Sequence, residues 1–201
     1  RRWHATVETA EGRELSVLIT AIGEAGNVDA GAFVASLIAE FSPGLVALVG
    51  IAAGVLDRTR LGDVVAARAV LGFEPQRLEP DRSAPRHLHV PAPIRIATDL
   101  VHFDPRAREA GWHDLYQECL QRIPRDEAPA DPPLHPRSCV AVVASGEKLF
   151  ADGSLPALRD QYDERIRAGE MEGIGVAVAA RRGQTEWLVV RGISDHGDPA
   201  T

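Results

Sequence analysis

Continuous apolar runs, each followed by small or polar residues, are the feature that most constrains the fold. LVALVG at residues 45–50 has no polar side chain, and SCVAVVAS at residues 138–145 is similar. Such runs are typical of strands covered on both faces, as in the centre of a parallel sheet. Between them, residues 28–41 have apolar side chains at helical spacing. This alternation predicts an α/β fold with three layers, in which helices flank a mixed, mainly parallel central sheet.

The other segments fit the same architecture. ATVETA and LSVLITA, joined by a turn at Gly12, predict a hairpin. Asn27 or Asp29 is the expected N-cap of the following helix. Further strands are expected within residues 61–73, 166–170 and 185–195, and further helices within 105–123, 155–162 and 173–182. Residues 74–93 and 124–136 are rich in proline and predict irregular connections.

Length and charge limit the kinds of partner. The 201 residues suit one domain, residues 1–201, and the net charge is -7. We therefore expect no nucleic-acid or anionic-membrane partner, since both need clustered basic residues. The acids and bases are interspersed, so we expect a small-molecule ligand.

Targeting and cofactor signals are few. We find no apolar run long enough for a membrane span and no signal peptide in residues 1–20. Cys119 and Cys139 form no metal motif, and we expect reduced thiols, a cytoplasmic location, no metal and no cofactor. Because the chain begins at Arg1 without a methionine, we expect it to be an excerpt of a longer, multidomain protein.

Three clusters of small or polar residues follow predicted strands, at residues 50–54, 145–148 and 194–198. In open α/β sheets, ligands bind outside the carboxyl ends of strands, so we expect these clusters to line a site. Each has a structural alternative. GIAAG at 50–54 could be a tightly packed strand exit, Phe150 could be a core residue, and Asp195 could cap a following helix.

Acidic residues carry the candidate chemistry. Asp195 directly follows a buried strand, where partial desolvation favours its protonated form and allows proton donation. Glu170 and Glu172 flank Met171 at the start of a small-residue helix. They could simply complement the helix dipole, or one could face a ligand.

The order of four pieces is more specific than any one of them. LVALVGIAAGVLDRTRLGDVVAA, SGEKLFADG, GEMEGIGVA and VVRGISDHGDP resemble the nucleoside phosphorylase and nucleosidase superfamily. They are most similar to the branch of methylthioadenosine/S-adenosylhomocysteine nucleosidases and related effector domains. The resemblance covers residues 16–72 and 138–198. It implies cleavage of the N-glycosidic bond of a purine, adenine-type nucleoside or nucleotide, and a homo-oligomer.

The resemblance also assigns roles to residues. It implies that Asp195 and Glu172 are catalytic, with Asp195 at the purine N7 and Glu172 on the ribose hydroxyls. The residues that it implies bind substrate are Met171, Ser194, Leu149, Phe150, Ala52, Ala53 and Gly54. Glu170 is expected to support the strand end or face solvent.

Two departures from the family pattern bear on the reaction. Leu48 and Ile51 stand where the phosphorylases place phosphate-binding side chains, which favours hydrolysis. A phosphate-dependent phosphorylase and an inactive nucleoside-binding or oligomerising module remain the alternatives. From the resemblance we expect residues 1–201 to lack the family's first strand and last helix, and the sequence does not identify the water-activating base.

Overall fold

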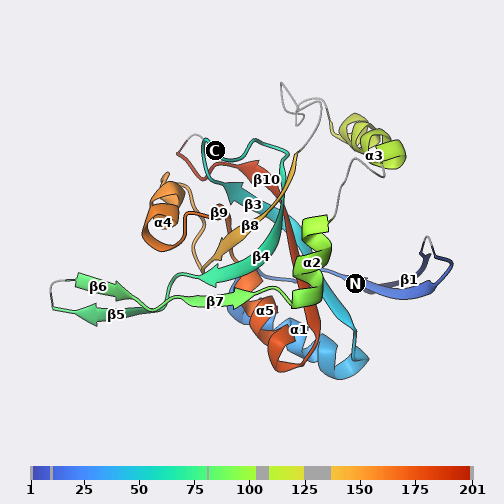
Figure 1. Cartoon of the computed structure of the whole chain (residues 1–201), viewed down its shortest axis with the longest axis horizontal. Helices are drawn as coiled ribbons and strands as arrows, with labels where there is room; N and C mark the ends of the chain where they lie inside the picture. The colour runs from blue at the N-terminus through green and yellow to red at the C-terminus, as the bar shows by residue number, and fades with distance from the viewer. Residues whose placement is uncertain (1, 10, 81, 103–108, 125–136, 200–201) are drawn as a thin grey trace.

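The computed structural model describes residues 2–9, 11–80, 82–102, 109–124 and 137–199 (Figure 1). The strands are β1 (Arg2–Glu8), β2 (Glu14–Thr20), β3 (Leu45–Gly54), β4 (Val64–Gly72), β5 (Gln76–Glu79), β6 (Arg82–Pro85), β7 (Leu88–Pro91), β8 (Ser138–Ser145), β9 (Ile166–Glu170) and β10 (Glu186–Asp195). The helices are α1 (Asn27–Phe41), α2 (Ile94–His102), α3 (Glu109–Arg122), α4 (Leu155–Tyr162) and α5 (Gly173–Arg182). Within the described residues, none of the helices has the length and apolar composition needed to cross a bilayer.

The central sheet has the strand order β10-β3-β9-β8-β4-β7. Its longest ladders, β10–β3 and β4–β8, are parallel, whereas β3–β9 and β4–β7 are antiparallel. The sheet is therefore mixed and mainly parallel, as predicted. Strand β10 also pairs with β4, so five strands close into a ring.

Helices cover both faces of this sheet, which confirms the three layers. One core lies between the sheet and α5 and includes Val65, Val143 and Trp187. A second core lies under α4 and includes Leu71, Leu155 and Ile166. Helix α1 packs outside α5, and Figure 1 shows these two helices together below the sheet.

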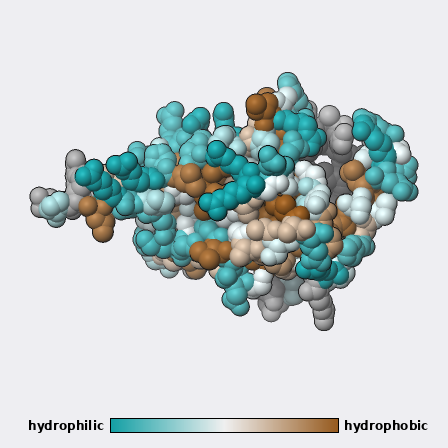
Figure 2. All heavy atoms as spheres, turned by 90° about the horizontal axis from the view of Figure 1, so that it is seen from below, coloured by the Kyte–Doolittle hydropathy of each residue, from teal (hydrophilic) through white to brown (hydrophobic). Residues whose placement is uncertain are grey.

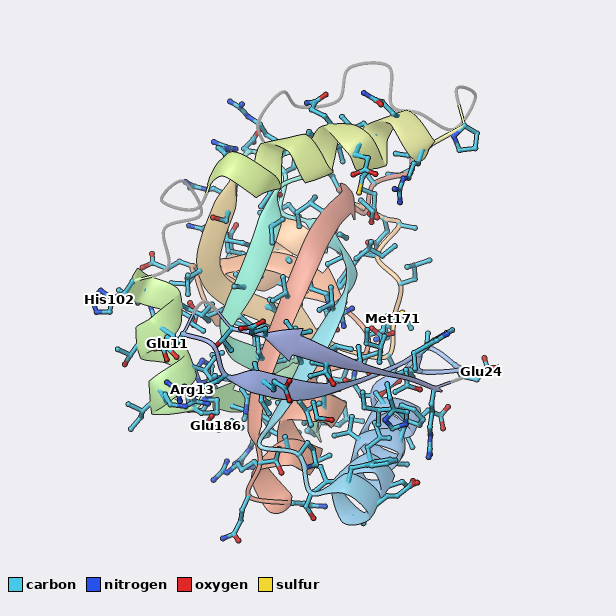
Figure 3. All side chains as sticks on the ribbon, turned by 90° about the vertical axis from the view of Figure 1, so that its right-hand side faces the viewer. Glu11, Arg13, Glu24, His102, Met171 and Glu186 are labelled. Atoms are coloured by element: carbon cyan, nitrogen blue, oxygen red, sulfur yellow. The ribbon has the colours of Figure 1, made fainter. Side chains whose placement is uncertain are left out.

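Strand β3 differs from the prediction for a central strand. Its first part alternates, with Val49 75% and Ile51 69% exposed, and only residues 52–54 are fully buried. Leu48 packs toward the core on the opposite face. The prediction of burial on both faces was wrong, because no described element covers the outer face of residues 45–51. The predicted hairpin of β1 and β2 is present; it overlaps β10 and β3 in the view of Figure 3 but projects away from the sheet in Figure 1.

Two other predictions need correction. Residues 74–93 contain the β5–β6 hairpin and strand β7 rather than an irregular connection. Helix α1 has no N-cap from Asn27 or Asp29; instead the carboxylate of Glu147 accepts hydrogen bonds from the Asn27 backbone N–H, 3.2 Å to each oxygen. The predicted connection at 125–136 and the start of the predicted helix at 105 lie outside the described residues.

Asp63 joins the beginnings of β4 and β8. Its buried carboxylate accepts hydrogen bonds from the backbone N–H of Arg60, and from the backbone N–H and side chain of Arg137. Burial alone would raise the pKa of Asp63, but these donors together hold that pKa below the usual 3.8. A carboxyl with a depressed pKa stabilises the fold above its unfolded-state pKa, and loses this effect as the pH falls through the folded-state pKa.

We therefore expect the substitution Asp63→Asn to destabilise the chain near neutral pH and to matter progressively less below pH 3.8. The measurement is the free energy of unfolding by denaturant as a function of pH. Asp160→Asn, at a mostly exposed carboxylate, is the control. A difference between Asp63→Asn and the native chain that is independent of pH would contradict this account.

Candidate active site

The strand register brings the three predicted clusters to two neighbouring rows across the sheet. Asp195 of β10 pairs with Ala53 of β3, and Ala53 pairs with Gly169 of β9. The next residue of β9, Glu170, pairs with Ser145 of β8. The backbones of Asp195 and Gly169 are thus two strand spacings apart, roughly 10 Å.

The prediction assumed that the carboxyl ends of these strands lie at one edge of the sheet, and the structure shows that they do not. Strands β3 and β10 are parallel to each other, but β3 is antiparallel to β9. Strands β3 and β9 overlap only where Ala53 and Gly54 pair with Gly169 and Ala168. The carboxyl ends therefore approach each other from opposite directions.

A buried ionic cluster lies beside this overlap. The Arg191 side chain is 4% exposed and the Glu170 side chain 1% exposed, and the two form an ion pair. The same Arg191 nitrogen, Nη2, donates a hydrogen bond of 2.9 Å to Glu172 Oε2. Burial of charges is tolerated when they are paired, so Arg191 fixes both carboxylates. Arg191 Nε has no hydrogen-bond partner among the described residues.

Glu170 has a second task at the start of α5. Its carboxylate accepts hydrogen bonds from the backbone N–H groups of Glu172, at 3.0 Å, and Gly173, at 2.8 Å. A carboxylate at a helix N-terminus satisfies free donors and complements the dipole. Glu170 therefore supports the strand end, which was one of the two expectations, and it does not face solvent.

Glu172 is the N-cap residue of α5. Its side chain is more exposed than those of Glu170 and Arg191, and Arg191 holds it from one side. Met171, between the two acids, is half-buried, and in the view of Figure 3 it lies beside β3 on the side away from β10.

Asp195 is held by local bonds at the end of β10. Its carboxylate accepts a hydrogen bond of 2.7 Å from the Ser194 hydroxyl and one of 2.8 Å from the Gly197 backbone N–H. The second bond forms an Asx turn. A register shift between Ile193 and Asp195 marks a bulge, which re-aims the side chains that follow. His196 Nε2 lies 3.1 Å from the Thr59 carbonyl oxygen.

The remaining predicted binding residues divide between core and surface. Leu149 is 81% exposed, whereas Phe150 is buried with its ring 5.7 Å from that of Phe73. Ala52 and Ala53 are buried in the two cores. GIAAG is the second half of strand β3 rather than a segment that follows the strand, because its backbone continues the pairing with β10.

A groove of about 830 Å³ lies beside the first turn of α5. Its walls include Asn27, Ala35 and Ile38 of α1 and Ile174 and Val178 of α5. Neither Glu172 nor Asp195 lines it. Figure 2 views the molecule from below, the side of α1 and α5, and shows apolar side chains scattered among hydrophilic ones.

Sequence reasoning did not identify Arg191 as a site residue. The signal was a lone charge inside the apolar strand EWLVVRGISD, since a buried arginine needs counter-ions. The described residues contain no group of three or more metal-ligating side chains. Cys119 and Cys139 are both free thiols.

Gly50 provides the space that Arg191 occupies. It pairs with Arg191 across β3 and β10, and a Cβ at Gly50 would lie 2.3 Å from Arg191 Nη1. We expect Gly50→Ala to displace the guanidinium and to destabilise the fold by about 1–3 kcal/mol, the usual cost of overpacking.

Gly44→Ala is the matched control, because a Cβ there meets nothing within 4 Å. The measurement is denaturant unfolding of both variants. Equal stability of the two alanine variants would show that Arg191 is not confined as the structure indicates.

Comparison with known proteins extends these observations. The family model described as the phosphorylase superfamily matches residues 2–201. ATP nucleosidase Cap17 of Escherichia coli (strain KTE188) is 31% identical over 98% of this chain and 39% of its own length. The uncharacterized protein y4jS of Sinorhizobium fredii is 25% identical over 98% of this chain and 46% of its own length. The chain thus spans less than half of these relatives.

Solved structures share the fold at low identity. The 5'-methylthioadenosine/S-adenosylhomocysteine nucleosidase of Neisseria meningitidis, in complex with methylthio-immucillin-A, has a TM-score of 0.65 at 16% identity, over 98% of this chain and 78% of that one. A futalosine hydrolase mutant of Helicobacter pylori has a TM-score of 0.63 at 14% identity, over 98% and 77%. Fold, element order and family model agree: the chain belongs to the phosphorylase superfamily.

Proposed function

We propose that this chain hydrolyses the N-glycosidic bond of an adenine nucleoside or nucleotide. The observation that carries the proposal is the row formed by Asp195, Ala53 and Gly169. It sets Asp195 of β10 on one side of the end of β3, and Glu170 of β9 on the other side, next to Glu172 at the start of α5. A purine riboside needs two such contacts, one at the base and one at the sugar.

Asp195 acts at the base in this proposal. Breaking the bond leaves electron density on the purine, and a proton shared from Asp195 with N7 makes the base a better leaving group. Ser194 and Gly197 already hold both carboxyl oxygens in one orientation. General acid assistance of this kind accelerates a reaction by about 10²–10⁴-fold.

Glu172 acts at the sugar. Ribose develops oxocarbenium character as the bond breaks, and an anionic group that binds the ribose hydroxyls favours that positive charge. Arg191 holds Glu172 by one hydrogen bond and leaves the rest of the carboxylate to bind the hydroxyls. An interaction that is stronger in the transition state than in the ground state raises the rate.

The nucleophile in this proposal is water. Phosphate binding needs charged or hydroxyl donors, and the family resemblance puts the apolar Leu48 and Ile51 at the sequence positions where the phosphorylases provide them. The exposed Leu149 is the candidate to cover the base, and Met171 to contact the sugar. Phe150, Ala52 and Ala53 would support these contacts from within the core, and the buried Gly54 from the end of β3.

The wider context is also proposed. A relative of this chain is an ATP nucleosidase, which supports a nucleotide as one candidate substrate. We further propose a homo-oligomer, a cytoplasmic location and a place within a longer protein. The length of the curated relatives supports the last of these.

The proposal predicts that the purified full-length protein releases adenine from adenosine, methylthioadenosine or ATP. Adenine is measured by chromatography, with and without inorganic phosphate. Free ribose or its 5'-derivative, independent of phosphate, is the expected co-product. Ribose 1-phosphate would instead identify a phosphorylase, and binding without release would identify a nucleoside-binding module.

Substitution tests the two carboxyl groups. We expect Asp195→Asn to lower kcat by about 10²–10⁴-fold, because the amide cannot donate the proton. Glu172→Gln should lower kcat/KM for the riboside while the affinity for free adenine stays the same. Asp160→Asn is the control at an exposed acid. Native activity in Asp195→Asn would remove the base-protonation step from the mechanism.

A further inference from the structure

Four successive backbone N–H groups at the start of α5 are satisfied by three side chains from three other elements. Glu170 accepts from Glu172 and Gly173. Ser145 Oγ, at the end of β8, accepts from the Ile174 N–H at 3.0 Å. Asn27 Oδ1, at the start of α1, accepts from the Gly175 N–H at 3.0 Å. The first N–H groups of a helix have no partner within it, so these side chains determine where the first turn lies.

Asn27 is the member of this set that comes from farthest away in the sequence. It is 8% exposed, and all of its amide atoms are used. In addition to the bond from the Gly175 N–H, its Oδ1 accepts a hydrogen bond of 3.0 Å from the Ser145 hydroxyl. Its Nδ2 donates a hydrogen bond of 3.0 Å to the Gly146 carbonyl oxygen. One amide therefore links α1, the end of β8 and the start of α5.

The backbone around Asn27 leaves it little freedom. A Cβ at Gly175 would lie 2.0 Å from the Asn27 carbonyl oxygen, so the two segments are in close contact. Gly26, just before Asn27, has φ 125°, and the Asn27 N–H is bound by Glu147. A side chain fixed in this way transmits its position to the groups that it binds.

We propose that Asn27 is a positioning residue for Glu172, acting through the first turn of α5. The inference rests on the proposed function, in which Glu172 binds ribose. Glu172 is the N-cap of the helix whose Gly175 N–H Asn27 binds. Loss of the amide frees this N–H and the Ser145 hydroxyl, and lets the turn shift relative to Arg191. Displacement of a substrate-positioning group by about 1 Å can cost 10²-fold in rate.

The first test compares Asn27→Ala with Val34→Ala, both in purified full-length protein with adenosine as the probe. Val34 is a buried α1 residue in the α1–α5 core, so its truncation weakens helix packing without touching the first turn. We expect Asn27→Ala to lower kcat/KM by about 10–100-fold. Val34→Ala should have little effect, and both variants should bind free adenine normally.

The second test is a double-mutant cycle with Glu172→Gln. If Asn27 acts through Glu172, Asn27→Ala should cost far less in the Glu172→Gln background than in the native one. Asn27→Asp keeps the acceptor for Gly175 but loses the donor to Gly146, so partial activity is expected. Ser145→Ala serves the same cycle if Asn27→Ala does not fold, because it removes the acceptor for Ile174.

The outcomes separate the two levels of the proposal. An active native protein in which the Asn27 and Glu172 substitutions act additively would overturn the positioning role alone. An equal loss in Val34→Ala would do the same. A native protein that binds adenosine but releases no adenine would overturn the proposed function, and the positioning role with it.

Discussion

A guanidinium buried in the sheet requires counter-charges, and this requirement organises the centre of the molecule. Arg191 comes from the middle of β10, and its partners Glu170 and Glu172 come from the β9–α5 junction. Removing one partner of such a pair leaves an uncompensated charge, at a cost of about 3–5 kcal/mol. The junction is thus tied to β10, while Gly50 leaves the space through which the arginine passes.

The ionic cluster is coupled to the start of α5, because Glu170 serves both. One of its oxygens, Oε2, meets Arg191 and the same carboxylate receives N–H groups of the helix. The helix therefore begins where charge pairing places it, rather than where local propensity would. Ser145 and Asn27 extend the set of acceptors to β8 and α1. A site built on such a turn is held by the whole α/β layer, which suits a group that must be placed accurately.

Much of the fold could be predicted from the chain itself. The period of the apolar residues identified the β1–β2 hairpin, α1 and strand β8, of which residues 141–145 are buried and residues 138–140 are exposed. Strand β3 misled, because a run such as LVALVG looks the same whether one face or both are covered. For residues 74–93 the error was the opposite one: their prolines predicted an irregular connection, whereas the segment forms a short hairpin and an edge strand. Both errors concern which elements pack against or pair with a segment, and the period of its apolar residues carries no information about that.

For the site, the sequence determined the types of residue and their order along the chain: the acids at 170, 172 and 195, each at a strand end or helix start. Only the tertiary structure decided which of them share an environment. It paired Arg191 with two glutamates and placed Asn27 at the start of a helix 148 residues away. The physical reason is that hydrogen bonds and ion pairs form across strand register and helix packing. Those contacts join residues whose separation in sequence leaves no local signal.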